Sequence, residues 1–304
     1  MKPHTIVLAG ALLIFGVWVV HAGEQAKPKR EPIYAEDGKG LERVEQALVT
    51  AKRENKRVLL KIGGNWCGWC YKLHDLFQKD KAIQTLLRDE YELVMIDSRA
   101  DKPVIEKWKI KPNGYPYLAV LDSMGMKVVE QETGSLETGD RHDPDKVKTF
   151  LEKWKPVPLD ANDVFAAALA QAKQENRRVF IRIGAPSNGW SRRMDAFLAK
   201  PEIETIMRKD YVVVKIDLQR MKRATEVMQR VRKPTEEGCF PWFAFLDRDG
   251  RILITSTKPG FGNIGFPVEP KNEIPYFLTM LKTTRSKITD ADIDLIAAEL
   301  AKPK

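Results

Sequence analysis

The chemistry that this sequence can perform centres on two cysteines, Cys67 and Cys70, in the motif Trp66-Cys67-Gly68-Trp69-Cys70. They follow an apolar run over residues 58–62, which predicts a strand that leads into a helix beginning at the cysteines. The unpaired N–H groups and the dipole at a helix N-terminus stabilise a thiolate on the first sulfur. The second cysteine lies one turn further along, where it can close a disulfide with the first. The spacing therefore indicates a reversible dithiol.

Three other uses of a Cys-x-x-Cys pair are weaker. A static disulfide across so short a loop constrains the unfolded chain very little. A tetrahedral zinc site needs four ligands, and the two cysteines with His74 supply three; an isolated histidine is more often a surface or half-buried side chain. Covalent haem requires a histidine where Tyr71 stands. We therefore expect no metal and no bound cofactor, because the redox centre is the Cys67–Cys70 disulfide itself.

The N-terminus has the pattern of an export signal. Lys2 is followed by an uncharged apolar run over residues 6–20 and by the small-residue cleavage pattern Val20-His21-Ala22. This run is shorter than the roughly 20 residues that a membrane span requires. We predict a cleaved signal peptide over residues 1–22, with an uncleaved membrane anchor as the less favoured alternative. Because disulfides persist outside the cytosol, we expect a periplasmic or secreted protein.

Length and charge limit the classes of function. The 304 residues suit two domains of ordinary size. The formal charge of +9 is distributed along the expected helices in alternation with acidic residues, which is typical of a solvated surface. The densest basic stretch, residues 220–233, carries apolar residues at helical spacing and has no basic–aromatic platform. We therefore expect no nucleic-acid partner.

The chain contains an internal repeat. Residues 47–63 and 168–184 match at about ten of seventeen positions, which indicates duplication. Each copy is expected to run helix, strand, helix, strand, helix, and then through an aromatic–proline step into a two-stranded hairpin and a closing helix. The helix before the proline step of the second copy is expected over about residues 222–231 and the last strand of that copy over residues 252–257, and the closing helix of the first copy over residues 144–154. This order predicts an α/β fold in which a mixed central sheet is flanked by helices on both faces.

The expected organisation of the chain follows from the repeat. A mobile charged tail over residues 23–40 precedes a first domain over residues 41–155 and a second over residues 158–285. Residues 286–304 form a C-terminal helix, which Thr289-Asp290-Ala291-Asp292 introduces as a capping box with aspartate in place of glutamate.

With these motifs the chain resembles the thioredoxin superfamily. Trp66-Cys67-Gly68-Trp69-Cys70 is similar to the active-site motif of that family, and Tyr115-Pro116 is similar to its cis-proline step, which lies beside the cysteines. The resemblance covers nearly all of residues 41–155 and, more weakly, 158–285. Within that superfamily it resembles exported bacterial thioredoxin-like thiol:disulfide interchange proteins. It implies two tandem thioredoxin-like domains, of which the second is degenerate.

The resemblance also implies roles for individual residues. Cys67 is the attacking thiolate, which forms a mixed disulfide with a cysteine-containing protein, and Cys70 is the thiol that resolves it. The backbone before Pro116 would pair with the substrate as an added strand. The expected substrate-binding residues are Trp66, Gly68, Trp69, Tyr115 and Pro116. For Trp69, packing beneath the loop is an equal alternative.

Lys61 departs from the family pattern. Six residues before the attacking cysteine, thioredoxins carry a buried acid that helps to move a proton off the resolving thiol. Here the position holds Lys61, and Arg182 is its counterpart in the second copy. A cation beneath the dithiol would favour thiolate, bias the pair toward an oxidant and make Lys61 a modulator. We favour the alternative, in which both side chains extend to solvent at the strand end.

The second copy lacks the dithiol. Asn188-Gly189-Trp190-Ser191 aligns with the first motif and contains no sulfur, while Pro241 keeps the proline step. Cys239, two residues before Pro241, is expected near this defunct site. It is either a modulating thiol that forms mixed disulfides or, as we favour, a buried and inert residue. The retained groove can still bind extended polypeptide.

The leading interpretation is an exported thiol–disulfide oxidoreductase that acts on cysteine-containing proteins and exchanges electrons with an external thiol–disulfide partner. The direction of electron flow stays open. A non-catalytic chaperone-like or partner-binding module is the rival interpretation, and a metal carrier that uses Cys67, Cys70 and His74 is a weaker one. The membrane is a partner only if the signal is uncleaved.

Overall fold

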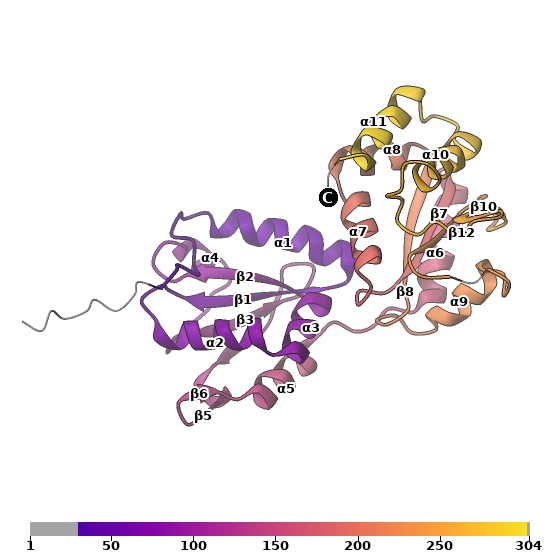
Figure 1. The fold of residues 1–304 in the computed structure, drawn as a ribbon. Helices are drawn as coiled ribbons and strands as arrows, with labels where there is room; N and C mark the ends of the chain where they lie inside the picture. The colour runs from indigo at the N-terminus through magenta and orange to yellow at the C-terminus, as the bar shows by residue number, and fades with distance from the viewer. Residues whose placement is uncertain (1–29, 237, 303–304) are drawn as a thin grey trace, which may run out of the picture.

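The computed structural model of the protein describes residues 30–236 and 238–302, which form two α/β units that follow one another along the chain (Figure 1). The expected signal peptide over residues 1–22 and the start of the expected tail, residues 23–29, lie outside the described residues. Within the described ranges, no helix is long and apolar enough to cross a membrane.

The first unit is built on a four-stranded mixed sheet of order β2-β1-β3-β4. Its strands are β1 (Arg57–Gly63), β2 (Tyr91–Asp97), β3 (Tyr117–Leu121) and β4 (Lys127–Glu132). β1 pairs in parallel with β2 and antiparallel with β3, and β4 pairs antiparallel with β3. The flanking helices are α1 (Gly40–Glu54), α2 (Gly68–Lys79), α3 (Lys81–Glu90), α4 (Lys102–Lys107) and α5 (Pro144–Trp154).

Helices cover β1 on both faces. Leu60 packs in a core with α1 and α4, whereas Leu59 packs in the opposite core with α2, α3 and α5. This placement explains why the strand reads as an apolar run and not as an alternating one. A small hairpin lies beside α2 and consists of the short helix η1 (Gly134–Leu136), β5 (Glu137–Thr138) and β6 (Arg141–His142).

The second unit repeats this architecture with a sheet of order β10-β9-β7-β8. β7 (Arg178–Gly184) pairs in parallel with β8 (Tyr211–Asp217) and antiparallel with β9 (Trp242–Leu246), which pairs with β10 (Ile252–Thr255). The other elements are α6 (Ala161–Gln174), α7 (Gly189–Leu198), α8 (Pro201–Asp210), α9 (Ala224–Val231), β11 (Thr257–Lys258), β12 (Gly262–Asn263), α10 (Glu273–Thr284) and α11 (Asp290–Leu300). The expected α/β class, with two mixed sheets flanked by helices, is confirmed.

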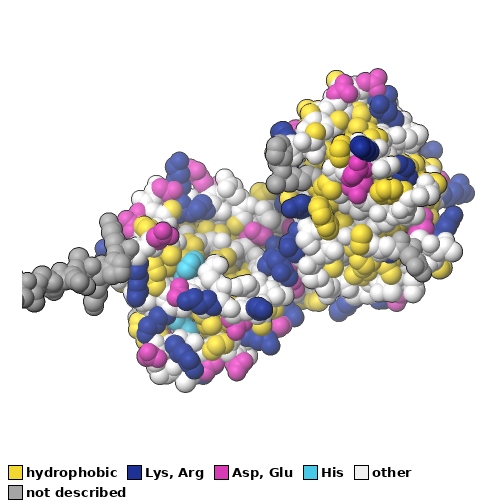
Figure 2. All heavy atoms as spheres, viewed as in Figure 1, with side chains coloured by type: hydrophobic (Ala, Val, Ile, Leu, Met, Phe, Trp, Pro, Cys, Tyr) yellow, Lys and Arg dark blue, Asp and Glu magenta, His cyan; other side chains and the backbone are white. Residues whose placement is uncertain are grey.

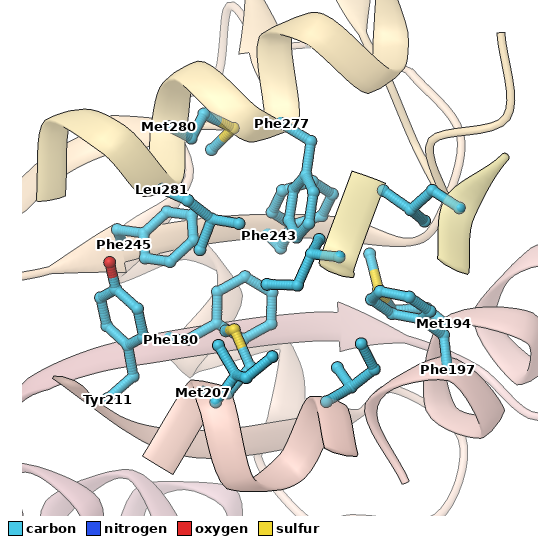
Figure 3. Packing of buried hydrophobic residues seen from close by; sticks show 14 of the residues in the cluster. Phe180, Met194, Phe197, Met207, Tyr211, Phe243, Phe245, Phe277, Met280 and Leu281 are labelled. Carbon is cyan, nitrogen blue, oxygen red and sulfur yellow. The ribbon is translucent and has the colours of Figure 1, made fainter. Parts of the chain in front are cut away.

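Aromatic side chains fill one core of the second unit (Figure 3). The ring of Phe180 on β7 lies 4.9 Å from Phe245 and 5.5 Å from Phe243 on β9. Phe277 on α10 packs edge-on against Phe243 at 5.6 Å, and Tyr211 lies 4.8 Å from Phe245. Because such rings bury large apolar areas in specific geometries, this core fixes α10 on the sheet.

Several element boundaries differ from expectation for local reasons. The expected strand over residues 252–257 ends at Thr255, because the buried Ser256 hydroxyl accepts the N–H of Phe243 at 3.0 Å. The expected helix over residues 222–231 begins at Ala224, because Arg223 has a left-handed φ of 56°. At the C-terminus, Thr289 and Asp292 form the predicted capping box at the start of α11.

Basic side chains of the second unit contact the end of α1. Arg220 donates to the carbonyl oxygens of Glu54 (3.0 Å) and Asn55 (2.7 Å) and forms an ion pair with Glu90 at 2.9 Å. Lys215 lies 2.7 Å from the Glu54 carboxylate. Burial alone would raise the pKa of Glu54, but Lys215 and a neighbouring arginine lower it to about 2. Elsewhere, basic and acidic side chains are interspersed on the visible face (Figure 2).

Candidate functional site

The two cysteines lie at the start of α2, directly after the loop that follows β1, as the sequence predicts. Cys67 is the N-cap of α2, and its sulfur accepts the backbone N–H of Cys70 at 3.1 Å. The sulfurs form a disulfide with Cα atoms 5.2 Å apart. Cys67 is 6% exposed and Cys70 is 0% exposed. An incoming thiolate can therefore reach only the Cys67 side of the disulfide.

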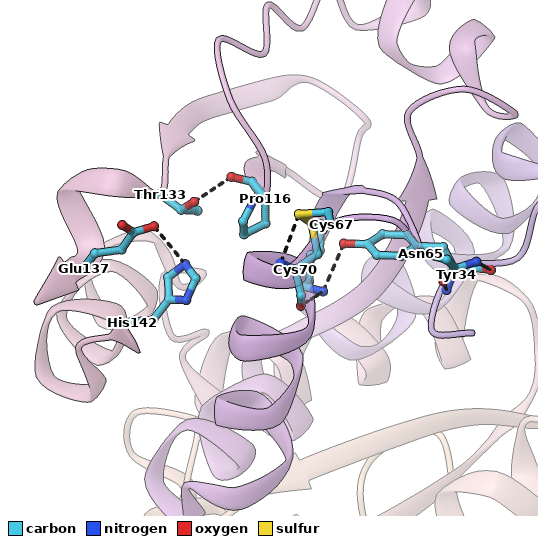
Figure 4. Close-up of a disulfide and its surroundings, with 9 residues drawn as sticks. Tyr34, Asn65, Cys67, Cys70, Pro116, Thr133, Glu137 and His142 are labelled. Atoms are coloured by element: carbon cyan, nitrogen blue, oxygen red, sulfur yellow. Dashed lines mark hydrogen bonds and ion pairs between the residues drawn. A yellow bond between two sulfur atoms is a disulfide. The ribbon is translucent and has the colours of Figure 1, made fainter. Parts of the chain in front are cut away.

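A cis peptide bond between Tyr115 and Pro116 lies beside the disulfide (Figure 4). The buried Thr133 hydroxyl donates to the Pro116 carbonyl oxygen at 2.6 Å. This bond holds the loop that contains Pro116 on the side away from the disulfide. Trp66 is half exposed, and its ring meets Tyr115 edge-on at 5.5 Å. These aromatic rings border Cys67 with apolar surface that a bound polypeptide can cover.

The other two expected binding residues lie at the start of α2. Gly68 is exposed, and no atom lies within 4 Å of the point where a Cβ would stand. Trp69 is half-buried; its ring contacts His142 edge-on at 5.4 Å, and Lys72 Nζ lies 4.1 Å from the ring centre. Trp69 therefore packs on the hairpin with one edge and keeps part of its ring accessible, and its role in substrate binding stays a prediction.

Lys61 lies beneath the dithiol, so the favoured expectation of a solvent-exposed side chain is wrong. Its residue is 0% exposed, because helices cover both faces of β1. The amine donates to the Tyr34 hydroxyl and to the Cys70 carbonyl oxygen, both at 3.0 Å. Burial lowers the pKa of Lys61 to about 7. An amine at the back of the disulfide is therefore neutral in a large share of molecules near neutral pH.

Two site residues that the sequence analysis missed are Tyr34 and Asn65. Asn65 Oδ1 accepts the N–H groups of Ile33 (2.9 Å) and Tyr34 (3.0 Å), and its Nδ2 donates to the Tyr34 carbonyl oxygen (2.9 Å) and to Glu36 (2.8 Å). These bonds seat Tyr34, 2% exposed, against Cys67 and Cys70. The expectation of a mobile tail over residues 23–40 therefore does not fit residues 33–36, which Asn65 anchors.

A buried histidine is a third residue that the sequence analysis missed. The His142 side chain lies on β6 against Trp69, with Nε2 3.6 Å from a Glu137 carboxylate oxygen (Figure 4). Burial, then Lys61 and Lys72, lower the pKa of His142 to about 4, so the imidazole is neutral at neutral pH. A two-residue strand far from the motif carries no sequence signal that places this side chain at the site.

Metal ligands do not gather at the dithiol. The parts of the chain that the structure describes contain no group of three or more His, Cys, Asp and Glu side chains that could hold a metal ion. His74 is half-buried, and burial followed by Lys61 lowers its pKa. The metal-carrier interpretation gains no support from this arrangement.

The second unit keeps the backbone of the site without its sulfurs. Asn188 caps α7 and accepts the N–H of Ser191 at 2.8 Å, which is the role that the Cys67 sulfur plays in the first unit. Phe240 and Pro241 are joined by a cis peptide bond. Cys239 is exposed, so the favoured expectation of a buried cysteine is wrong. It lies in the loop before β9, two residues before Pro241.

Arg182 is also buried, which corrects the expectation that it extends to solvent. Its residue is 1% exposed, and it forms an ion pair with Asp195. Asp195 in turn lies 2.9 Å from Lys215. The second unit thus compensates the buried cation with a carboxylate, whereas Lys61 forms no ion pair with any described residue.

Comparisons with known proteins agree with this fold. A thioredoxin-like family model, Thioredoxin_7, matches residues 41–123, and the model Thioredox_DsbH, described as "Protein of unknown function, DUF255", matches residues 144–301. Spermatogenesis-associated protein 20 of Mus musculus is 32% identical over 63 residues, which cover 21% of this chain and 8% of that protein. The match thus spans less than a tenth of the length of this curated relative.

Two solved structures illustrate the similarity. The disulphide isomerase from Xylella fastidiosa Temecula1 is 24% identical with a TM-score of 0.37, covering 40% of this chain and 96% of that one. A DsbH oxidoreductase is 19% identical with a TM-score of 0.29, covering 42% of this chain and 92% of that one. Since the Thioredox_DsbH model matches just over half of the 304 residues, the chain belongs to the Thioredox_DsbH (DUF255) family, with a thioredoxin-like segment around its dithiol.

Proposed function

We propose that the protein is an exported thiol–disulfide oxidoreductase that exchanges disulfides with cysteine-containing proteins through Cys67 and Cys70. The observation that carries the proposal is the asymmetry of the pair. Cys67 caps α2 beside the cis-Pro116 step, and the sulfur of Cys70 is buried behind it. An attacking and a resolving cysteine need this arrangement, because only one of them meets the substrate.

In the reducing direction, the Cys67 thiolate attacks one sulfur of a substrate disulfide. The substrate S–S bond breaks, its other sulfur leaves as a thiolate that takes a proton from water, and a mixed disulfide forms on Cys67. Deprotonated Cys70 then attacks Cys67 Sγ, the second substrate thiolate leaves, and the Cys67–Cys70 disulfide forms. Two electrons have passed to the substrate, and an external dithiol returns them. The oxidising direction is the reverse.

The residues around Cys67 are proposed to bind the substrate polypeptide. The backbone of Tyr115 would pair with an extended segment as an added strand, while the rings of Trp66 and Trp69 cover it on two sides. The second unit is proposed to bind substrate or a partner without chemistry. It keeps the cis-Pro241 step and a capped helix in the same positions.

Export is part of the proposal, because the signal pattern over residues 1–22 suits a dithiol that works where disulfides persist. A periplasmic or secreted mature chain would begin near Gly23. Intact-mass measurement of the protein from an exporting host tests this. A chain that keeps residues 1–22 would instead favour a membrane anchor.

Trapping tests the redox function in the full-length protein. In a Cys239→Ser background, Cys70→Ser should accumulate mixed disulfides with client proteins, because nothing resolves the adduct on Cys67. The matched Cys67→Ser variant should trap none. Adducts that form equally on both variants would contradict the assigned roles. Client binding that persists without either cysteine would favour the chaperone-like alternative.

The reduction potential of Cys67–Cys70 decides the direction. A value near that of thioredoxin, about −270 mV, would indicate a reductant, and one near −120 mV an oxidant. Titration in glutathione or dithiothreitol buffers measures it. Absence of a reversible two-electron couple would refute the enzyme interpretation.

A further inference from the structure

Cys70 must lose a proton before it can attack, and its buried surroundings contain few groups that can accept one. Its residue is 0% exposed, so bulk water does not reach the sulfur. The acid that thioredoxins use here is replaced by Lys61. Resting on the oxidoreductase function above, we propose that Tyr34 and Lys61 form the proton path of Cys70: the Tyr34 hydroxyl takes the thiol proton while its own proton moves to the Lys61 amine.

Tyr34 lies beside Cys70 at the back of the disulfide (Figure 4), and Lys61 forms a hydrogen bond with each of these two residues. Lys61 Nζ lies 3.0 Å from the Tyr34 hydroxyl and 3.0 Å from the Cys70 carbonyl oxygen. The point at which a Cβ on Gly63 would stand is 2.4 Å from Cys70 Sγ and 2.6 Å from the Tyr34 hydroxyl. The sulfur and the hydroxyl therefore border one small space, which glycine leaves open. Sulfur, hydroxyl and amine follow one another in the order that a short relay needs.

The amine can accept the proton because of its surroundings. Burial lowers the pKa of Lys61 to about 7, and no described carboxylate forms an ion pair with it. The protonated amine donates to both the Tyr34 hydroxyl and the Cys70 carbonyl oxygen. Once neutral, it can still donate one N–H to the Cys70 carbonyl oxygen, and its lone pair can accept the Tyr34 O–H. His74 on α2 and His142 on β6 face the same region, and burial followed by Lys61 lowers the pKa of both. The His142 imidazole, with a pKa of about 4, is therefore neutral near neutral pH, and the lowered pKa of His74 favours its neutral form.

Tyr34 acts as a carrier in this path and is not itself the base. Burial, then Asp97 and Tyr71, raise the pKa of its hydroxyl, so a resting phenolate does not form near neutral pH. The hydroxyl can, however, take one proton as it releases another. Asn65 holds the backbone of Tyr34 through three hydrogen bonds to Ile33 and Tyr34, which keeps the hydroxyl in place.

The step balances without a further reactant. The S–H bond of Cys70 breaks as an O–H bond forms on Tyr34, and the former Tyr34 proton binds Lys61 Nζ to give an ammonium. The electron pair on the Cys70 sulfur attacks Cys67 Sγ and displaces the substrate sulfur as a thiolate. When the external dithiol reduces Cys67–Cys70 again, Lys61 returns the proton along the same path.

A two-step thiol reagent separates this event from the attack of Cys67. The fully reduced full-length protein, in a Cys239→Ser background, is mixed with 5,5′-dithiobis(2-nitrobenzoate). The first thionitrobenzoate is released when Cys67 attacks and the second when Cys70 resolves the adduct. Stopped-flow absorbance between about pH 6 and pH 9 gives a rate for each step, a range that brackets the pKa of an ordinary thiol.

Two variants break the path in different ways, and one serves as a control. Tyr34→Phe removes only the hydroxyl, and Lys61→Met keeps an unbranched side chain without the amine. The control, Tyr71→Phe, removes a hydroxyl that donates to the Glu31 carbonyl oxygen at 3.0 Å on the same N-terminal segment. It leaves the Lys61–Tyr34 hydrogen bond intact.

We expect the second phase of the parent protein to rise with a midpoint near pH 7, the pKa of Lys61. Tyr34→Phe and Lys61→Met should slow that phase at least about tenfold at neutral pH and move its midpoint to about 8.5 or above, as for an unassisted thiol. The first phase, and both phases of the control, should keep their rates.

Two results would overturn the proposal. The second phase could keep its rate and midpoint in both variants, or both phases could slow together with unchanged midpoints, which is what a purely structural role predicts. Failure of the oxidoreductase function looks different. In that case the parent protein would show no Cys67-dependent first phase at all.

Discussion

Gly63 separates the dithiol from Tyr34, and replacing it with alanine is a direct test of how tightly the site is packed. An added Cβ would stand 2.4 Å from Cys70 Sγ and 2.6 Å from the Tyr34 hydroxyl. Real side-chain carbons do not approach other atoms so closely, so one neighbour must move. Both neighbours are buried side chains with little room, since Cys70 is 0% and Tyr34 2% exposed.

Crowding of this kind costs about 1–3 kcal/mol in a well-packed core. In the oxidised protein Cys70 Sγ is bonded to Cys67 and cannot rotate away, whereas in the reduced protein its side chain can adopt another rotamer. The cost therefore falls mainly on the oxidised form. Because 30 mV corresponds to about 1.4 kcal/mol for a two-electron couple, we expect Gly63→Ala to raise the reduction potential by about 20–60 mV.

Redox titration and thermal unfolding of matched variants measure the effect. At the corresponding place in the second unit, a Cβ on Gly184 would stand 2.5 Å from Ser191 Oγ and 2.7 Å from Arg182 Nη1. Gly184→Ala should thus lower the Tm of both redox forms and leave the potential unchanged. Gly189→Ala, whose nearest contact is at 3.7 Å, should change neither. An unchanged or lower potential in Gly63→Ala, or an equal rise in Gly184→Ala, would refute the reasoning.

The remaining predictions concern the surroundings of the site. Asn65→Ala removes four hydrogen bonds to residues 33–36, each worth about 0.5–1.5 kcal/mol, so amide hydrogen exchange at Tyr34 should accelerate markedly while β1 stays protected. Arg220→Ala loses the Glu90 ion pair and two bonds to the end of α1, so proteolysis of the link over residues 155–160 should accelerate. For Lys61, the folded pKa of about 7 lies below the ordinary 10.5, so the unfolded chain binds more protons between these values and stability rises with pH there. Urea unfolding of the oxidised protein at about pH 7 and pH 9 should show a rise that Lys61→Met removes.

Each of these predictions has an outcome that contradicts it. Equal exchange at Tyr34 in Asn65→Ala would mean that the N-terminal segment is held by other contacts. Arg248→Ala, which loses an exposed bond to Asn176 at 2.6 Å, is the control for Arg220→Ala; equal cleavage in both would rule out a specific role at α1. Stability that rises equally with pH in Lys61→Met would show that Lys61 does not titrate in this window.

The fold was predictable where local chemistry is decisive. The helix over Pro144–Trp154 was expected with its observed bounds, because Asp143 and Pro144 begin it: the aspartate accepts the N–H groups of Asp145 and Lys146. Asn55 is the C-cap of α1, and Asn176 follows the C-cap of α6, with left-handed φ values of 49° and 51°, a conformation that asparagine tolerates. Such signals lie within a few residues of the structure they determine.

The back of the dithiol was predictable only as one of two alternatives for Lys61, because it is assembled by long-range contacts. A lysine in an apolar run reads as a side chain that reaches water, yet helices from both sides close over Lys61. Its partner Tyr34 comes from a charged segment 27 residues earlier in the chain. His142 lies on a two-residue strand of a separate hairpin, which places it against Trp69. No hydrophobic periodicity or helix cap in the sequence indicates that Tyr34 contacts Lys61 or that His142 contacts Trp69. Only the tertiary structure reveals these contacts.

The two units each bury a basic side chain at the corresponding position of the central strand, Lys61 on β1 and Arg182 on β7. The difference between their surroundings supports a chemical role for Lys61. Arg182 forms an ion pair with Asp195, which offsets the cost of burying a charge. Lys61 has no such partner among the described residues and is neutral in a large share of molecules near pH 7. A buried amine without an ion-pair partner, even one that donates two hydrogen bonds, stabilises the fold less than an apolar side chain of its size would. The lower stability caused by the buried amine is found in the unit that has the dithiol. There, only the Tyr34 hydroxyl lies between the amine and the Cys70 sulfur, which must lose its proton.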